Sequence, residues 1–184
     1  MLKKFVQELF DEVLEDAFNL EEEQNQAVKP TPETVLGYSL YQEQLNWIDF
    51  CFKETGKTKV LNGARHYGKT KAVTIYGSAL ELFSNKQTSI IIATRDLSRS
   101  KGILRYIVYS LKKLGISISK LNSRELWLKE NKGFEPNIYA TTIDADGFRG
   151  RHVDIAILDD PVISKDERSE VERENTIATT FIKK

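Results

Sequence analysis

The sequence has one cysteine and four prolines among 184 residues, carries no net charge, and contains no long hydrophobic run. A single cysteine, Cys51, excludes an intrachain disulfide and fits a reducing compartment. The 27 basic and 27 acidic residues cancel, so overall charge does not indicate a polyanion-binding protein. No run approaches the roughly 20 apolar residues that span a membrane, and the N-terminus is too acidic for a signal peptide. These absences predict one cytoplasmic globular domain without a membrane partner.

The chain is predicted to consist of three parts. Residues 1–26 have apolar positions at helical spacing and are predicted to form an amphipathic helix. Residues 27–37 contain two prolines and a glycine and are interpreted as a linker. Residues 38–184 form the main domain, which begins with a helix whose predicted apolar face consists of Tyr41, Leu45, Ile48 and Phe52.

From residue 57 onward, short apolar runs alternate with helical stretches. Buried strands are predicted at "TKVLNG", "TSIIIAT" and "VDIAILDD", two further strands at "RELWLKENKGFEPNIYATTI", and helices at residues 70–84, 98–114 and 166–183. Such alternation predicts an α/β fold with a mostly parallel sheet flanked by helices.

A phosphate-loop pattern lies directly after the first predicted strand and opens the next helix. It consists of Gly63, Gly68, Lys69 and Thr70 in "GARHYGKT". Backbone N–H groups of such a loop surround phosphate oxygens, the lysine reaches the β and γ phosphates, and the threonine hydroxyl binds magnesium. ATP is therefore expected to contact the whole loop, which also contains Ala64, Arg65, His66, Tyr67 and Lys71. His66 and Tyr67 are expected to pack the loop rather than to take part in catalysis.

Hydrolysis also requires a carboxylate for the metal and a group that directs the attacking water. "IAILDDP" supplies both at the end of a predicted strand, where a ligand crevice is expected. Asp159 is predicted to hold Mg²⁺ and Asp160 to orient or deprotonate the water. Arg65 is a candidate for stabilising transition-state charge, with a salt bridge or a contact to another subunit as the alternatives.

Together these motifs resemble the ATPase domain of large terminase subunits, the motors that package DNA into tailed-phage and herpesvirus capsids. "YQEQLNWI" is similar to the family's adenine motif, with Gln42 as the first candidate for reading adenine and Gln44 as the second. "ARHYGKT" resembles its variant phosphate loop, "DADGFRGRHVDIAILDDP" its acidic strand, and "RSEVERENTIATTFIKK" the helix that follows. The resemblance spans residues 38–184.

The resemblance implies a P-loop NTPase with a RecA-like sheet that couples ATP hydrolysis to translocation of double-stranded DNA. It also implies a homo-oligomeric ring, a portal and a small terminase subunit as partners, and a location in the infected host cytoplasm and transiently at the capsid portal. The chain departs from the family by having Asp160 where Glu is common, and by stopping before the coupling motif and nuclease domain. We therefore expect a truncated chain without nuclease activity, completed by a second polypeptide.

Two other functions remain open: a helicase-like DNA translocase fragment and a non-catalytic nucleotide-binding module. DNA contact has its own candidate surface on the helix at residues 98–114, where a solvated basic face is the alternative. The basic residues concerned are Arg99, Lys101, Arg105, Lys112 and Lys113. "GFRG" at residues 147–150 is interpreted as a tight turn, with nucleotide or DNA sensing by Arg149 as the alternative.

Overall fold

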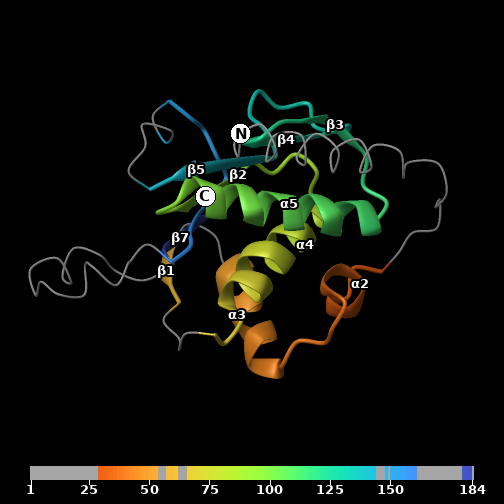
Figure 1. Cartoon of the computed structure of the whole chain (residues 1–184), viewed down its shortest axis with the longest axis vertical. Helices are drawn as coiled ribbons and strands as arrows, with labels where there is room; N and C mark the ends of the chain where they lie inside the picture. Colours follow the sequence, from red (N-terminus) through yellow and green to blue (C-terminus); the bar gives the residue numbers. More distant parts are fainter. Residues whose placement is uncertain are drawn as a thin grey trace, which may run out of the picture.

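The structure is a computed structural model that describes residues 29–53, 57–61, 66–143, 148, 150–160 and 180–183. The predicted N-terminal helix at residues 1–26 lies outside these ranges. Helices pack against a mixed, partly parallel β-sheet, so the fold is α/β (Figure 1). The sheet has the order β1-β7-β6-β2-β5-β4-β3.

The described strands are short, and most of them coincide with the predicted apolar runs. Their bounds are β1 Lys57–Val60, β2 Ile90–Thr94, β3 Ile118–Leu121, β4 Glu125–Leu128, β5 Ile138–Thr142, β6 Ile155–Leu158 and β7 Thr180–Lys183. β2 is buried along its whole length because it is central and has a neighbour on each side. β3 was not predicted, although Ile116 and Ile118 alternate with polar residues in the short "ISIS" stretch.

The prediction of a mostly parallel sheet is wrong for the described strands. Only β2 runs parallel to its neighbours, β5 and β6, whereas every other described pair is antiparallel. The two strands predicted at "RELWLKENKGFEPNIYATTI" are β4 and β5, and they pair antiparallel. The antiparallel pairs lie on both sides of the parallel β5-β2-β6 centre: β3 and β4 pair antiparallel beyond β5, and β7 runs opposite to both β6 and β1.

β1, the strand before the phosphate-loop motif, is an edge strand rather than a buried parallel one. It pairs antiparallel with β7, which separates it from β6. Val60 is 43% exposed, as expected at an edge. β7 also corrects the helix predicted for residues 166–183, because residues 180–183 are a strand; residues 166–179 lie outside the described part.

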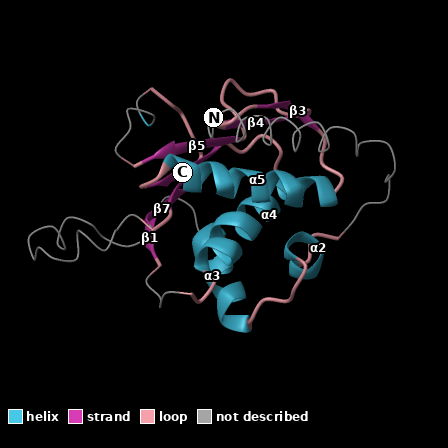
Figure 2. Cartoon of the chain, in the orientation of Figure 1, coloured by secondary structure: helices cyan, strands magenta, loops and turns pink. Residues whose placement is uncertain are grey.

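The helices are α2 Pro32–Leu36, α3 Gln42–Phe52, a π-helix η2 Thr70–Gly77, α4 Ser78–Ser84 and α5 Leu97–Lys113. α5 packs along β2 and β5, while η2 and α4 lie between α5 and α3 (Figure 2). The apolar residues that recur at helical spacing along α5 are buried, as is the residue that follows the helix: Ile103, Leu104, Ile107, Val108, Leu111 and Leu114. In α3, Ile48 and Phe52 are buried as predicted, but Tyr41 precedes the helix and is 80% exposed.

Part of the stretch interpreted as a linker is a short helix. Thr31 caps α2 by accepting a hydrogen bond from the Thr34 N–H, and Gly37 ends the helix with a φ of 83°. Val35 is buried in the core, and the Tyr76 hydroxyl donates to the Pro30 carbonyl at 2.8 Å. The prolines and the glycine therefore lie at the two ends of a short helix that packs on the core, and not in an extended linker.

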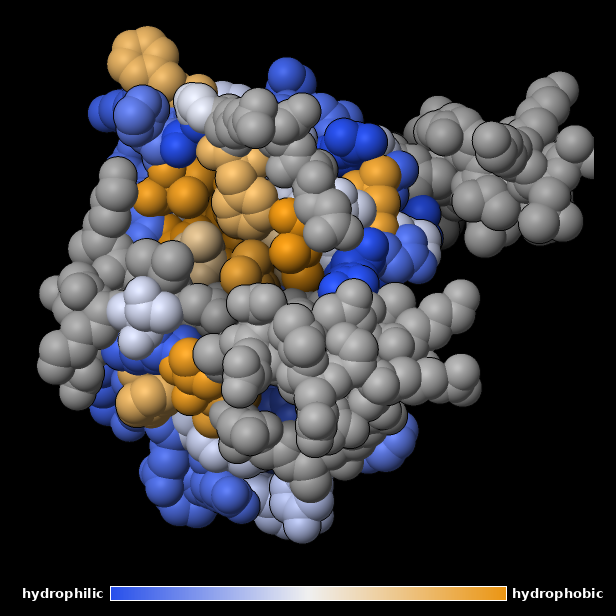
Figure 3. Space-filling view, turned by 90° about the vertical axis from the view of Figure 1, so that its left-hand side faces the viewer, coloured by the Kyte–Doolittle hydropathy of each residue, from blue (hydrophilic) through white to orange (hydrophobic). Residues whose placement is uncertain are grey.

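The hydrophobic core lies between the sheet and the helices. Its fully buried members include Leu82 of α4, Ile92 of β2 and Ile157 of β6. Figure 3 shows the side that lies on the left of Figure 1, where hydrophobic residues gather in a larger area in the upper half and a smaller one below it. Among the described residues, no helix combines the length and the apolar character needed to cross a bilayer.

Candidate functional site

The two predicted acids emerge at the carboxyl end of β6. The Asp159 N–H donates to the Ala93 carbonyl of β2 at 2.9 Å, which continues the ladder one residue beyond the strand. The Asp159 side chain is 3% exposed and that of Asp160 is 58% exposed. Asp160 has a φ of 51°, in the left-handed region that non-glycine residues seldom adopt. This turn separates the two acids into one buried carboxylate and one exposed carboxylate.

Thr70 of the phosphate-loop motif contacts Asp159, which lies 89 positions away in the sequence. The Thr70 hydroxyl lies 3.0 Å from both carboxylate oxygens of Asp159 and donates to them. Thr74, one turn further along η2, donates to Oδ1 of the same carboxylate at 3.3 Å. The fold thus brings the end of the motif and the acidic strand end into direct contact.

The environment of Asp159 acts on its pKa in opposite directions. Burial raises the pKa above its ordinary value of 3.8 and is the largest effect. Hydrogen bonds from Thr70 and Thr74 and the charge of Arg99 favour the ionised form and lower the pKa, while the charge of Asp160 raises it. Without further positive charge at this site, ionising the carboxylate therefore costs free energy.

Arg99 in the first turn of α5 bridges both acids. Its Nη1 donates to Oδ2 of Asp160 at 2.8 Å, and its Nη2 lies 3.6 Å from Oδ2 of Asp159. The sequence suggested Arg99 only as a DNA contact. No local pattern links it to the acids, because the contact depends on how α5 leaves β2.

The described part of the phosphate-loop motif makes a tight turn into η2. His66 and Gly68 have positive φ values of 68° and 77°, and the Gly68 carbonyl accepts from the Ala72 N–H at 2.9 Å. The positive φ of Gly68 favours glycine, and a Cβ there would lie 2.9 Å from Nε2 of Gln44, so a larger residue would have to displace the Gln44 amide. Lys69 precedes η2 with helical backbone angles.

Gln44 connects the predicted adenine motif to this turn. Its Nε2 donates to the Tyr67 carbonyl at 2.8 Å, and its Oε1 accepts from the Tyr41 N–H at 3.0 Å. Gln42 instead donates to Asn46 on the same helix at 3.1 Å. Among the described residues, it is therefore Gln44, not Gln42, that hydrogen-bonds from the predicted adenine motif to the phosphate-loop motif.

The remaining predicted residues of the phosphate-loop motif lie in other surroundings or outside the described part of the chain. The Lys71 ammonium lies 5.4 Å from the centre of the Tyr38 ring. The expectation that His66 and Tyr67 pack the loop is wrong, because both residues are exposed, Tyr67 by 58%. Gly63, Ala64 and Arg65 lie outside the described residues. Thr74 belongs to the site but was not predicted; its position four residues after Thr70, one helical turn away, is the signal that could have identified it.

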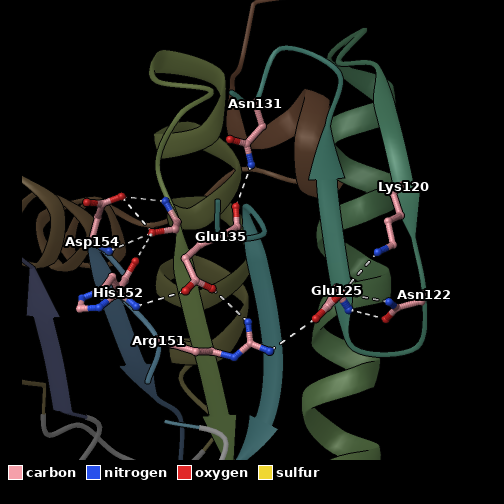
Figure 4. Close-up of polar contacts among 9 residues, drawn as sticks. Lys120, Asn122, Glu125, Asn131, Glu135, Arg151, His152 and Asp154 are labelled. Atoms are coloured by element: carbon pink, nitrogen blue, oxygen red, sulfur yellow. Dashed lines mark hydrogen bonds and ion pairs between the residues drawn. The ribbon is translucent and has the colours of Figure 1, made fainter. Parts of the chain in front are cut away.

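The segment before β6 is tied to the β4–β5 hairpin by Arg151 (Figure 4). The Arg151 guanidinium contacts Glu135 at 3.1 Å and Glu125 at 3.5 Å, and it lies 3.6 Å from the centre of the Tyr139 ring. Gly150 has a φ of 73°, consistent with the predicted turn, whereas Gly147 and Arg149 lie outside the described residues. These contacts fix the segment that leads into β6, the strand that Asp159 follows.

The oxygen atoms at this site suit a magnesium ion. The Thr70 hydroxyl and the Asp159 carboxylate are adjacent oxygen ligands, and Mg²⁺ usually combines one or two carboxylates with water and substrate phosphates. Among the described residues there is no cluster of three or more His, Cys, Asp or Glu that could bind a metal ion unaided. A metal held here would therefore complete its coordination with water or phosphate oxygens in addition to the protein oxygens.

Comparison of the sequence with protein-family models and with curated proteins gives no match.

Proposed function

We propose that this chain is a magnesium-dependent ATPase with a P-loop, RecA-like fold, most similar to the ATPase domain of large terminase subunits. The observation that carries the proposal is the contact between Thr70 and Asp159 at 3.0 Å. The phosphate-loop motif and the acidic strand end were each predicted to supply a magnesium ligand, and these two ligands are in contact although they lie 89 positions apart in the sequence. The parallel arrangement of β5, β2 and β6, with the acids at the carboxyl end of β6, supports the fold assignment.

Binding would use the turn at Gly68 and the start of η2. The motif's backbone N–H groups, from Gly63 to Lys71, would surround the phosphates, and Lys69 would contact the β and γ phosphates. Thr70 and Asp159 would hold Mg²⁺, which neutralises phosphate charge when bound. Because Gln44 contacts the loop itself, we assign to it the role of linking adenine recognition to phosphate binding, with Gln42 as the second candidate.

Hydrolysis would use the exposed acid. Asp160 is accessible to solvent at the edge of the site, where it can orient the water that attacks the γ phosphate. Lys69, together with Arg65 of the same loop, would stabilise the charge that develops on the phosphate oxygens.

Coupling to double-stranded DNA is the further part of this proposal. Arg105, Tyr106 and Tyr109 are exposed on α5, and the Lys113 ammonium lies 4.4 Å from the centre of the Tyr109 ring. Cationic and aromatic side chains on one helix suit contacts with a phosphate backbone. DNA binding through this face should weaken steeply as salt rises, and a flat response would exclude it.

The decisive experiment measures steady-state ATP hydrolysis with Mg²⁺ for the wild type and Lys69→Ala. We expect the substitution to abolish most of the activity because it removes the charge that contacts the γ phosphate. Lys53→Ala is the matched control, since Lys53 is exposed and pairs only with Asp49 one turn away among its described contacts. Equal rates for wild type and Lys69→Ala would overturn the enzyme assignment.

The two alternative functions give different results in the same preparation. A non-catalytic module would bind a fluorescent ATP analogue in a Lys69-dependent manner without turning ATP over. A helicase-like fragment would hydrolyse ATP, and strand separation with a forked duplex would distinguish it from a packaging motor, which moves along intact duplex DNA.

A further inference from the structure

We propose that Arg99 is a positioning residue that neutralises the Asp159–Asp160 pair and is displaced when magnesium and nucleotide bind. This inference rests on the proposed function, but it assigns a role to a residue that the motifs do not include. Three described side chains are involved: Asp159 and Asp160, which follow the carboxyl end of β6, and Arg99 at the start of α5.

The geometry gives Arg99 a separate nitrogen for each acid. Nη1 contacts Asp160 at 2.8 Å and Nη2 lies 3.6 Å from Asp159. Guanidinium groups are suited to such two-point contacts because their donors are held in one plane. Arg99 therefore fixes the exposed acid relative to the buried one.

The position of Arg99 on its helix is electrostatically unfavourable without these acids. Arg99 lies in the first turn of α5, where the positive end of the helix dipole disfavours a cation. Asp96 caps this turn by accepting from the Ser98 N–H at 2.8 Å, which fixes the direction in which the helix begins. The acid pair offsets the unfavourable position, so Arg99 is held at the site by charges that a metal would also use.

Metal binding and the Arg99 contact compete for the same carboxylate oxygens. At Asp159, Oδ1 accepts from Thr70 and Thr74, while Oδ2 accepts from Thr70 and faces Arg99. A magnesium ion shared by Thr70 and Asp159 would place two positive charges close to the guanidinium. Repulsion between them would favour release of Arg99 from Asp159, and by reciprocity Arg99 would weaken metal binding.

This exchange gives the site a connection to α5. Arg99 belongs to the same helix as the exposed Arg105, Tyr106 and Tyr109, on which the proposed DNA contact depends. Release of Arg99 by magnesium and nucleotide would remove the tie between the acids and the first turn of that helix. Occupancy of the nucleotide site would thereby change how the start of α5 is held.

The test compares the magnesium dependence of binding of a fluorescent ATP analogue for the wild type, Arg99→Ala and Arg99→Gln. Coupling between two sites commonly changes affinity by about 5- to 150-fold, and we expect the half-saturating Mg²⁺ concentration to fall by roughly tenfold in both variants. Two variants are used so that misfolding of one, seen by circular dichroism, does not decide the result. Arg124→Ala, which removes an exposed arginine in the β3–β4 turn, should leave the magnesium dependence unchanged.

A second arm uses MgCl₂ alone and measures thermal unfolding. A ligand that binds only the folded state raises the midpoint temperature, so tighter metal binding should give a larger increase for Arg99→Ala than for the wild type. If the wild type binds no nucleotide, the proposed function fails while this arm still tests Arg99. An unchanged or higher magnesium requirement in the Arg99 variants, in either arm, would overturn the inference.

Discussion

Replacing Thr70 with valine tests the contact on which the candidate site depends. The substitution exchanges the hydroxyl for a methyl group of similar size, so the shape of the side chain is kept while its hydrogen bond to Asp159 is lost. We expect the ligand-free protein to become less stable, because the Asp159 carboxylate is buried and loses a donor. We also expect magnesium-dependent nucleotide binding to weaken.

The size of the effect follows from the geometry. The Thr70 hydroxyl has a single proton and lies 3.0 Å from both Asp159 oxygens, so it makes one charge-assisted hydrogen bond shared between them. Such a bond contributes about 1.5–3 kcal/mol, and Thr74, whose hydroxyl is 3.3 Å from the same carboxylate, compensates in part. We therefore expect a loss of about 2 kcal/mol. For a chain of this size that corresponds to a decrease of about 4–8 °C in the midpoint of thermal unfolding.

The assay is chemical denaturation over a series of pH values from acidic to alkaline in the presence of a chelator, with Thr70→Ser as the control because serine keeps the hydroxyl. The sign of the pH dependence is also fixed. Since the Thr70 hydrogen bond lowers the pKa of Asp159, removing it raises that pKa further. The stability difference between wild type and Thr70→Val should therefore be fully present above the variant's pKa, and should shrink as pH falls through the raised pKa and the carboxylate becomes protonated. A difference below about 0.5 kcal/mol at the alkaline end of the series, or one independent of pH, would refute the assigned contact.

Three further predictions concern other parts of the fold. In chemical denaturation, Gly68→Ala should lower the free energy of unfolding more than Gly37→Ala, because both glycines have a positive φ but only a Cβ at position 68 would displace the Gln44 amide. Equal losses would contradict a contribution from the Gln44 contact. Leu82→Ala should lower the free energy of unfolding by about 2–5 kcal/mol, since the side chain is fully buried, and a loss below about 1 kcal/mol would place Leu82 outside the core. Burial raises the pKa of Cys51 to about 11, so a thiol reagent at pH 8 should label the folded protein far more slowly than the urea-unfolded protein, and equal rates would contradict its burial.

Local patterns were sufficient to predict most of the elements near the site. The period of apolar residues in α5 fixed which face is buried, and the apolar run "IAIL" located β6 together with the acids after it. Thr70 and Asp159 could be assigned to one site in advance because their chemistry is complementary and the carboxyl ends of parallel strands share an edge. These features depend on neighbours a few residues away, which is the information that a sequence contains most directly.

The pairing of strands at the sheet edge could not be predicted in this way. β1 was expected inside a mostly parallel sheet because short apolar runs alternate with helical stretches, yet it pairs antiparallel with β7 at the edge. Strand order depends on which distant segments satisfy each other's backbone hydrogen bonds, and short apolar runs of similar composition do not encode that choice. The four-residue strand at 180–183 likewise follows a charged stretch whose composition favoured a helix.

The amino-acid sequence by itself determined the chemistry available at the site: a glycine turn, a lysine, a threonine and two adjacent acids. Only the tertiary structure decided that Gln44 rather than Gln42 contacts the loop, that Asp159 is buried while Asp160 is exposed, and that Arg99 bridges them. The physical reason is that each of these contacts joins residues from different elements. Their distances depend on how helices and strands pack, not on spacing along the chain.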